Sequence, residues 1–269
     1  MKKTISFAII VMFSVLSAEA QIKIIGHRGV RHNTPQQAET PYYENTIPAL
    51  QYCQTLGIYA AEFDVQLTSD NKVIVFHGPT IPGTNMSIWN STFDQARSFT
   101  LPGGSRRPSL DEYLEQGKKC PQTKLICEIK RQPSPRGETI LVEQVIAAVR
   151  RMGMEEQVEY TTFSEWTLTE IHRIAPDAKV IFIDSGVFVK APEYLHSIGA
   201  NAVSYNFDGF MNNPGYAARA KELGMETTLW VVNDYEPVNW AILHGIDYIS
   251  SDHPEIIKLY VDRLKMFER

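Results

Sequence analysis

The stretch Ile25-Gly26-His27-Arg28-Gly29 guides the interpretation of the whole chain, because an apolar run ends there in two chemically capable side chains. A second apolar run, residues 59–66, carries Glu62 and Asp64 two positions apart, and the following run ends at His77. Alternate residues of a strand point to the same face, so the two carboxylates share a face. These strand ends predict a divalent metal beside a proton-transfer group and an anion-binding cation.

Short β-branched runs alternate with helical patterns along the chain, which predicts a mostly parallel sheet covered by helices. The predicted strands are 22–27, 59–66, 72–77, 123–130, 157–163, 178–183, 201–205 and 226–232. The predicted helices are 44–56, 109–118, 138–152, 164–174, 190–198, 213–223 and 235–243. An α/β barrel typically has about 250 residues, and no repeat or linker divides this chain, so we expect one domain over residues 21–269.

Two features disturb the alternation. Ile246 to Ser250 is a ninth apolar run, one more than a barrel of eight strands needs. The adjacent runs 59–66 and 72–77 are candidates for a hairpin through Ser69-Asp70-Asn71. The segment 78–108 is rich in proline and glycine, so we expect an insertion that lies over the strand ends.

The first twenty residues have the pattern of a signal peptide, with Lys2-Lys3, an apolar run from Ile5 to Leu16, and the small-residue site Ala18-Glu19-Ala20. The apolar run is shorter than the roughly 20 residues of a bilayer span. We therefore expect cleavage after Ala20, export to the periplasm or the medium, and no stable membrane anchor afterwards. The formal net charge of −5 argues against a nucleic-acid partner.

Polar side chains at the strand ends of a barrel gather on one side of it. Glu128 and Lys130 share a face of their strand, as Glu62 and Asp64 do. Three inward carboxylates with one lysine leave an excess of negative charge, which a hard cation such as Ca²⁺ or Mg²⁺ would neutralise. The alternative is a set of buried ion pairs among these carboxylates, Lys130 and Arg28.

His27 and His77 suit general acid–base catalysis because imidazole titrates near neutral pH; the alternative is that they bind the metal or are held in the core by backbone groups. Arg28 and Lys130 are suited to hold phosphate oxygens, although a carboxylate partner is the alternative for Arg28. Glu44 opens a predicted helix, where it would favour the helix dipole, or it reaches into the site as a ligand or as a partner of Arg28. This combination of groups indicates cleavage of a phosphodiester.

An ordered series of motifs runs from residue 24 to about residue 257. Its members are His27-Arg28-Gly29, Glu44-Asn45-Thr46, Glu62-x-Asp64, Thr68-x-Asp70, His77, Pro108-Ser-Leu-Asp-Glu, Glu128-Ile-Lys130, Trp230-x-x-Asn233 and Ser251-Asp252-x-Pro254. In this order they resemble the glycerophosphodiester phosphodiesterases, in the phosphatidylinositol phospholipase C-like superfamily. The resemblance implies a (β/α)₈ TIM barrel with an inserted segment after the third predicted strand.

The resemblance also implies roles for individual residues. The metal would be bound by Glu62, Asp64 and Glu128, the proton transfers would fall to His27 and His77, and the phosphate would be held by Arg28 and Lys130. Trp230 would form a wall of the alcohol pocket, although an aromatic residue after a β run can equally belong to the core. The resemblance gives Asp252 no clear role.

The implied reaction is metal-dependent hydrolysis of a small glycerophosphodiester to glycerol 3-phosphate and an alcohol, with either water or a hydroxyl of the substrate as the attacking group. The chain departs from the family at His77-Gly78, where His-Asp is usual, and in the polar stretch from Val30 to Tyr43. One alternative is a phosphodiesterase of another head group, such as a glycosyl-glycerol phosphate, a teichoic-like polymer or a phosphoinositol. Another is a non-catalytic binder of phosphodiesters or sugars.

Overall fold

The computed structural model describes residues 22–31, 42–101 and 104–267. Within these residues, eight parallel strands form a closed barrel, because β1 pairs with both β2 and β9. The barrel strands are β1 (Lys23–Gly26), β2 (Ala60–Leu67), β4 (Lys124–Ile129), β5 (Val158–Thr162), β6 (Val180–Asp184), β7 (Ala202–Asn206), β8 (Glu226–Trp230) and β9 (Tyr248–Ser251). The predicted barrel is confirmed, and each predicted strand lies within a few residues of an observed one.

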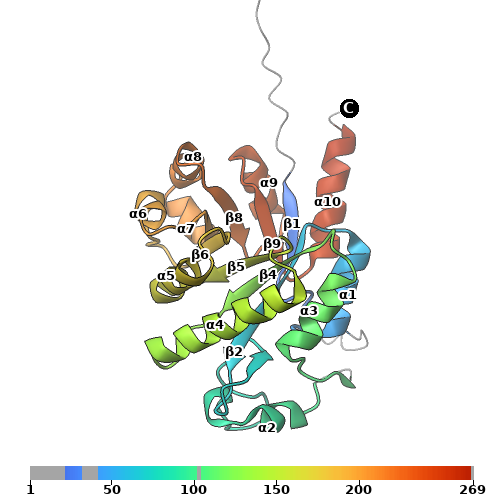
Figure 1. The fold of residues 1–269 in the computed structure, drawn as a ribbon. Helices are drawn as coiled ribbons and strands as arrows, with labels where there is room; N and C mark the ends of the chain where they lie inside the picture. The colour runs from blue at the N-terminus through green and yellow to red at the C-terminus, as the bar shows by residue number, and fades with distance from the viewer. Residues whose placement is uncertain (1–21, 32–41, 102–103, 268–269) are drawn as a thin grey trace, which may run out of the picture.

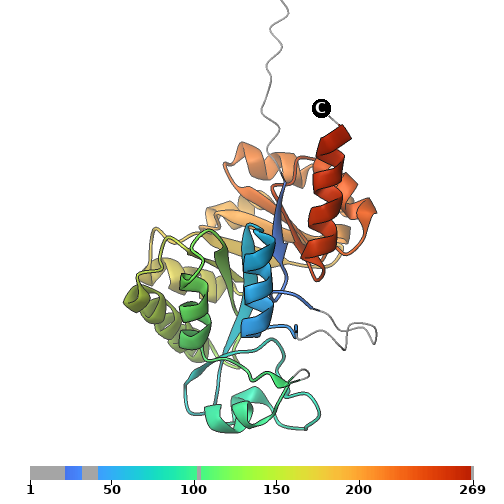
Figure 2. The ribbon, with the colours of Figure 1, turned by 90° about the vertical axis from the view of Figure 1, so that its right-hand side faces the viewer.

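Helices surround the barrel on its outside (Figures 1 and 2). They are α1 (Ile47–Leu56), α3 (Leu110–Lys118), α4 (Pro135–Met152), α5 (Glu165–Ile174), α6 (Pro192–Ser197), α7 (Phe207–Asn212), α8 (Tyr216–Glu222), α9 (Tyr235–Leu243) and α10 (Pro254–Phe267). In the part of the chain that the structure describes, no helix is long and apolar enough to span a bilayer. The predicted signal peptide falls outside the described residues, as does most of the polar stretch between Val30 and Tyr43.

Three helix predictions need correction. The predicted helix 44–56 begins only at Ile47, because Asn45 has a φ of +59° and the Thr46 side chain caps the helix by accepting from the Ala49 amide. The predicted helix 138–152 begins three residues earlier, where Ser134 caps it and Pro135 occupies the first turn. The predicted helix 213–223 corresponds to α8, which begins three residues later, at Tyr216, whereas α7 and α10 were not predicted.

The extra strand β3 (Val73–Val75) lies outside the barrel and pairs antiparallel with the end of β2. This confirms the predicted hairpin and identifies the peripheral member among the nine apolar runs. The following insertion contains a 3₁₀ turn, η2 (Ile88–Asn90), and helix α2 (Phe93–Ser98). It encloses its own small core of Ile74, Phe76, Ile81, Ile88 and Ala96. Both views show it beyond the carboxyl end of β2, at the bottom of the molecule, which agrees with the predicted place (Figures 1 and 2).

Strand alternation divides the interior into two apolar regions. Side chains such as Phe63 and Cys127 point outward and pack against the surrounding helices. Inside the barrel, a smaller cluster fills the end from which the strands start; it consists of Ile25, Ala60, Ile126, Ile181, Ala202 and Tyr248. The next inward positions on β2 and β4 are Glu62 and Glu128, so the apolar filling gives way to charged groups toward the carboxyl ends of the strands.

Candidate active site

A cavity of about 150 Å³ opens at the carboxyl ends of the barrel strands. Among its lining residues are His27, Arg28, Glu62, His77, Glu128, Lys130 and Trp230. Two further predicted residues lie behind this wall, where Glu44 and Asp64 contact the Arg28 guanidinium at 3.0 and 3.7 Å. The structure therefore brings together all nine side chains that the sequence singled out.

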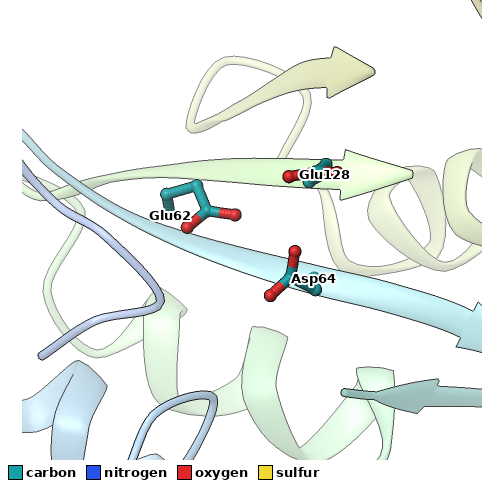
Figure 3. A group of neighbouring side chains, drawn as sticks. All are labelled: Glu62, Asp64 and Glu128. Atoms are coloured by element: carbon teal, nitrogen blue, oxygen red, sulfur yellow. The ribbon is translucent and has the colours of Figure 1, made fainter. Parts of the chain in front are cut away.

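Glu62, Asp64 and Glu128, here called the carboxylate cluster, face one another from two neighbouring strands (Figure 3). Their ligand-type oxygen atoms lie within 4.8 Å of one another, and all three side chains are buried. Asp64 and Glu128 are paired in the register of β2 and β4, which places them side by side. This convergence follows from the sequence, because alternate residues on two adjacent parallel strands point to one side of the sheet.

Two cations offset part of the negative charge of the carboxylate cluster. The Lys130 Nζ atom lies 2.8 Å from Asp64 Oδ1 and 2.6 Å from Glu128 Oε1, as ion pairs whose angles fall outside hydrogen-bond geometry. Arg28 adds the weaker contact to Asp64. Ion pairs, the alternative interpretation of these residues, are thus present, but they leave Glu62 without a cationic partner among the described residues.

The pKa values of the three carboxyl groups show that the ionised form is disfavoured at Glu62 and Glu128 and favoured at Asp64. Burial and the neighbouring Asp64 and Glu128 carboxylates raise the pKa of Glu62 well above its usual value. Burial also raises the pKa of Glu128 to about 7, although Lys130 opposes the shift. For Asp64, burial alone would raise the pKa, but Lys130, His77 and Arg28 outweigh it and lower the pKa.

The Glu62 Oε1 atom is buried and has no hydrogen-bond donor among the residues that the structure describes, whereas Oε2 accepts from the Arg28 amide at 2.6 Å. A buried carboxylate oxygen without a donor is costly unless a cation reaches it. Carboxylate oxygens are also the ligands that Ca²⁺ and Mg²⁺ prefer. The residues of the carboxylate cluster therefore fit a divalent cation.

Asn45 holds Asp64 in place, a function that the sequence analysis did not assign to it. Its Nδ2 atom donates to Asp64 Oδ2 at 2.7 Å, and its Oδ1 accepts from the Asp64 amide at 2.9 Å. Asn45 lies in the turn before α1, where its φ of +59° directs the side chain toward both the carboxylate and the amide of Asp64. Asparagine tolerates this backbone region better than most residues, which is the one local signal that could have pointed to it.

The turn after β1 places the next two functional residues. Gly26 is required there, since a Cβ atom would lie 2.2 Å from the Gly29 carbonyl oxygen and 2.5 Å from the Cys53 sulfur. Arg28 has a φ of +54°, and its guanidinium bonds to Glu44 at 3.0 Å. Glu44 also contacts Arg31 at 3.0 Å. Of the alternatives given for Glu44, the structure supports the one in which it is the ion-pair partner of Arg28. Glu44 lies before the first residue of α1, and it is not one of the three carboxylates of the cluster.

His27 is paired with Asp252, a residue whose role was not predicted. The His27 Nδ1 and Asp252 Oδ1 atoms lie 2.7 Å apart. Asn233 supports the other side of this carboxylate, since its Nδ2 donates to Asp252 Oδ2 at 2.9 Å and its Oδ1 accepts from the Asp252 amide at 3.0 Å. Burial would raise the pKa of Asp252, but the contacts with His27 and Asn233 lower it to about 2. An ionised Asp252 orients the His27 ring through this contact.

His77 lies in a different electrostatic environment. Its Nε2 atom is 2.7 Å from the Arg28 Nη2 atom, which can only donate, so His77 accepts there. Burial lowers the pKa of His77 to about 4, with help from Lys130 and Arg28 and against the opposing effect of Asp64. The following residue, Gly78, has room for a side chain, because a Cβ atom would meet nothing closer than 3.6 Å.

Trp230 lines the cavity. This position agrees with a residue of the cavity wall, the first of the two interpretations given above, and the alternative was a residue of the core. Its Nε1 atom donates to the Ser204 carbonyl oxygen at 3.1 Å, and its ring meets Phe163 edge-on at a centroid distance of 5.8 Å. A second hollow adjoins the cavity and shares His77 and Lys130 with it; Trp89 of the insertion lines this hollow. The insertion thus contributes to the mouth of the site.

Comparisons with known proteins agree with this geometry. The chain is 26% identical over 247 residues to a glycerophosphodiester phosphodiesterase from Caldanaerobacter subterraneus subsp. tengcongensis, with 87% of this chain and 95% of the relative covered. The crystal structure of a glycerophosphodiester phosphodiesterase from Parabacteroides distasonis superposes with a TM-score of 0.84 at 27% identity, over 92% of this chain and 99% of that one.

A phosphodiesterase from Oleispira antarctica, solved in complex with the product sn-glycerol-3-phosphate, shares the fold with a TM-score of 0.74 at 17% identity, over 89% of this chain and 96% of that one. The model of the glycerophosphoryl diester phosphodiesterase family matches residues 27–256. That match begins at His27 and spans the strands that carry the carboxylate cluster and Asp252. This chain therefore belongs to the glycerophosphoryl diester phosphodiesterase family.

Proposed function

We propose that the protein hydrolyses glycerophosphodiesters to glycerol 3-phosphate and an alcohol, with a divalent cation bound and with histidines as proton-transfer groups. The observation that carries the proposal is the cavity itself. It joins the buried carboxylate cluster, two imidazoles and two cationic side chains at the carboxyl end of a barrel, where the active sites of such barrels lie.

The carboxylate cluster would hold the cation, which we propose to be Ca²⁺ or Mg²⁺. When bound, such a cation supplies positive charge to phosphate oxygens and so stabilises the charge that develops on them. The fit rests on the Glu62 Oε1 atom, which has no donor, and on the raised pKa values of Glu62 and Glu128.

The protein's own cations would bind and orient the phosphate. Arg28 presents a planar guanidinium suited to two phosphate oxygens, and Lys130 presents a single positive charge beside it. Glu44 and Asp64 contact the Arg28 guanidinium and so restrict where its remaining N–H groups can point. Together these side chains would set the direction of the scissile P–O bond relative to the imidazoles.

One imidazole would take the proton of the attacking oxygen, and the other would give a proton to the leaving alcohol oxygen. Asp252 contacts the His27 Nδ1 atom and so fixes the orientation of this imidazole. The attacking oxygen is that of water or a neighbouring hydroxyl of the substrate. Transient formation of a cyclic phosphate, followed by ³¹P NMR, distinguishes the second route from the first.

The test is release of glycerol 3-phosphate from glycerophosphocholine, with and without a chelator. We expect the chelator to abolish activity and Ca²⁺ or Mg²⁺ to restore it. We expect His27→Ala and His77→Ala each to lower kcat by about 10²- to 10⁴-fold. His172→Ala is the matched control, because that histidine bonds to the Gly199 carbonyl oxygen on the outside of the barrel. Activity that persists with chelator, or in both active-site variants, would contradict the proposal.

The alcohol head group is a separate part of the proposal. Trp230 and Phe163 form an aromatic wall on one side of the cavity, and Trp89 lies at its mouth. A panel of glycerophosphodiesters at fixed metal concentration, with choline, ethanolamine, inositol and glycosyl head groups, ranks the candidates by kcat/KM. A preference of more than about tenfold for an inositol or glycosyl substrate would favour the second candidate function, a phosphodiesterase of that head group.

We further propose that the protein acts outside the cytoplasm after removal of residues 1–20. The support is the pattern of Lys2-Lys3, the apolar run and the Ala18-Glu19-Ala20 site. N-terminal sequencing of the protein from the expressing cells and from their medium or periplasm tests this. A chain that retains its first twenty residues in every fraction would contradict it.

A further inference from the structure

Gln66 occupies the inward position on β2 that follows Glu62 and Asp64, and it is 1% exposed. The two N–H groups of its Nε2 atom are shared among three successive backbone carbonyl oxygens, those of Phe76, His77 and Gly78, at N···O distances of 3.1, 2.9 and 2.7 Å. One amide group thus holds the backbone on both sides of His77. The function proposed above gives Gln66 no role.

The His77 ring is held by the Arg28 Nη2 atom at 2.7 Å, but few other contacts fix the backbone of this part of the chain. The Phe76 amide donates to the Asp64 carbonyl oxygen at 3.0 Å, and the Ile88 amide donates to the Pro79 carbonyl oxygen at 2.8 Å. Between these points, no backbone amide of the described residues donates to the carbonyl oxygen of His77 or of Gly78. The chain also leaves the core here, since Phe76 is buried and His77 only partly so.

We propose that Gln66 is a positioning residue that sets the place of the His77 imidazole in the active site. The inference rests on the proposed function, in which His77 transfers a proton. Gly78 gives the backbone after His77 wide conformational freedom, so the hydrogen bonds from Gln66 are what confine it. A displacement of about 1 Å in a reacting group costs on the order of 10²-fold in rate.

The chain contains a matched control for this arrangement. Gln157, at the start of β5, is also buried, and its Nε2 atom donates to the carbonyl oxygens of Gly117, Cys120 and Thr123 at 2.9, 3.1 and 2.9 Å. Gln157 lies at the amino end of the barrel strands, opposite the cavity. Loss of its amide removes the same kind of contact without touching the active site.

The experiment compares Gln66→Met with Gln157→Met in the full chain, assayed with a glycerophosphodiester that the parent hydrolyses. We expect Gln66→Met to lower kcat by roughly 10- to 100-fold and to change KM by less than about threefold, because Arg28, Lys130 and the carboxylate cluster stay in place. We expect Gln66→Met and Gln157→Met to lower the Tm by similar amounts. We expect Gln157→Met to leave kcat within about twofold of the kcat of the parent.

A rescue experiment separates positioning from mere packing. A Cβ atom at Gly78 meets no close atom, and alanine restricts the backbone by about 0.4–1 kcal/mol, which corresponds to a factor of about 2–5. We therefore expect Gly78→Ala to raise the kcat of the Gln66→Met variant by about that factor. If Gln66→Met fails to fold, Gln66→Asn, whose amide is one methylene too short, takes its place under the same criteria.

Three results would overturn the inference: a kcat of Gln66→Met within twofold of the parent, an equal loss of kcat in Gln157→Met, or a loss confined to KM. A parent protein that hydrolyses no glycerophosphodiester is a different outcome. It would overturn the proposed function, and this inference with it.

Discussion

Asp252 illustrates how much a single residue contributes to the site. It lies 225 positions from His27 in the sequence, yet it is the partner of that imidazole in the folded chain. Asn233, at the end of the preceding barrel strand, holds the Asp252 carboxylate and its amide at the same time. The orientation of His27 therefore depends on side chains from three strand ends.

Asp252→Asn should lower kcat by roughly 10- to 100-fold, because loss of the carboxylate weakens the charge-assisted contact that orients the His27 ring for the proposed proton transfer. KM should change much less, since Asp252 does not line the cavity. Steady-state kinetics with a glycerophosphodiester measure both. Asn239→Ala is a suitable control, as the side chain of this residue accepts from the Tyr260 hydroxyl on the outer surface. An unchanged kcat in Asp252→Asn would show that His27 needs no carboxylate partner.

The same residue predicts a pH dependence of stability. The pKa of Asp252 falls from an ordinary value of 3.8 to about 2 in the folded protein. A carboxyl group with a lowered pKa stabilises the fold above its unfolded pKa and loses this contribution as the pH falls through the folded value. The Tm difference between the parent and Asp252→Asn should therefore be full above about pH 4 and shrink between pH 4 and pH 2. A difference that grows over this range would contradict the assignment.

At the scale of elements, β2 supplies more of the site than any other strand. Its inward positions carry Glu62, Asp64 and Gln66, in the order in which the strand approaches the mouth of the barrel. The first two belong to the carboxylate cluster, and the third holds the backbone around His77. Its last residues also pair with β3, so the strand that bears the acids fixes the start of the insertion as well.

Helix α3 offers a test of element stability that is separate from catalysis. Its capping box has both bonds, with the Glu112 amide donating to Ser109 Oγ at 3.1 Å and the Ser109 amide donating to the Glu112 carboxylate at 2.7 Å. Ser109→Ala should lower the free energy of unfolding by about 1 kcal/mol and leave kcat unchanged. Chemical denaturation and the hydrolysis assay measure the two quantities.

Thr92→Ala is the matched comparison, because Thr92 and Gln95 form the same capping box on α2. Helix α2 has only six residues and lies in the insertion, so it can open locally without unfolding the barrel. We expect a smaller effect on global unfolding than for Ser109→Ala. A larger effect would mean that the insertion unfolds together with the barrel.

At the scale of the whole molecule, the metal binding proposed for the carboxylate cluster predicts an effect on stability. A ligand that binds only the folded state at 100 times its Kd adds about 2.7 kcal/mol to the free energy of unfolding. Ca²⁺ or Mg²⁺ should therefore raise the Tm of the parent protein. Glu62→Gln should abolish this shift. Its own metal-free Tm should equal or exceed that of the parent, since burial and neighbouring acids make the ionised Glu62 unfavourable.

Glu138→Gln is the control for this experiment. Glu138 is a buried carboxylate on α4 that accepts from the hydroxyls of Ser164 and Thr167, away from the cavity. Its replacement should lower the Tm and keep the metal-induced shift. A shift that survives in Glu62→Gln would place the metal elsewhere.

Much of this architecture could be predicted because it depends on short-range patterns. Alternation with a period of two residues places Glu62 beside Asp64 and Glu128 beside Lys130 on inward faces, wherever the strands lie. The hairpin through Ser69-Asp70-Asn71 and the capping box at Ser109 are equally local. The errors in the helices have local causes too, but their signals are weaker: a left-handed Asn45 delays the start of α1, and the six-residue helix α7 is too short to show a helical period.

What the sequence by itself determined is therefore the order of strands and helices and the face on which each reactive side chain points. The tertiary structure alone decided which of these side chains meet. Closure of the barrel between β1 and β9 brings Asp252 to His27, and the turn before α1 brings Asn45 to Asp64. Such pairs join segments far apart in the chain, so no local periodicity of the sequence predicts them. Their hydrogen bonds stabilise the protein only after the folding of the whole barrel has fixed both partners in place.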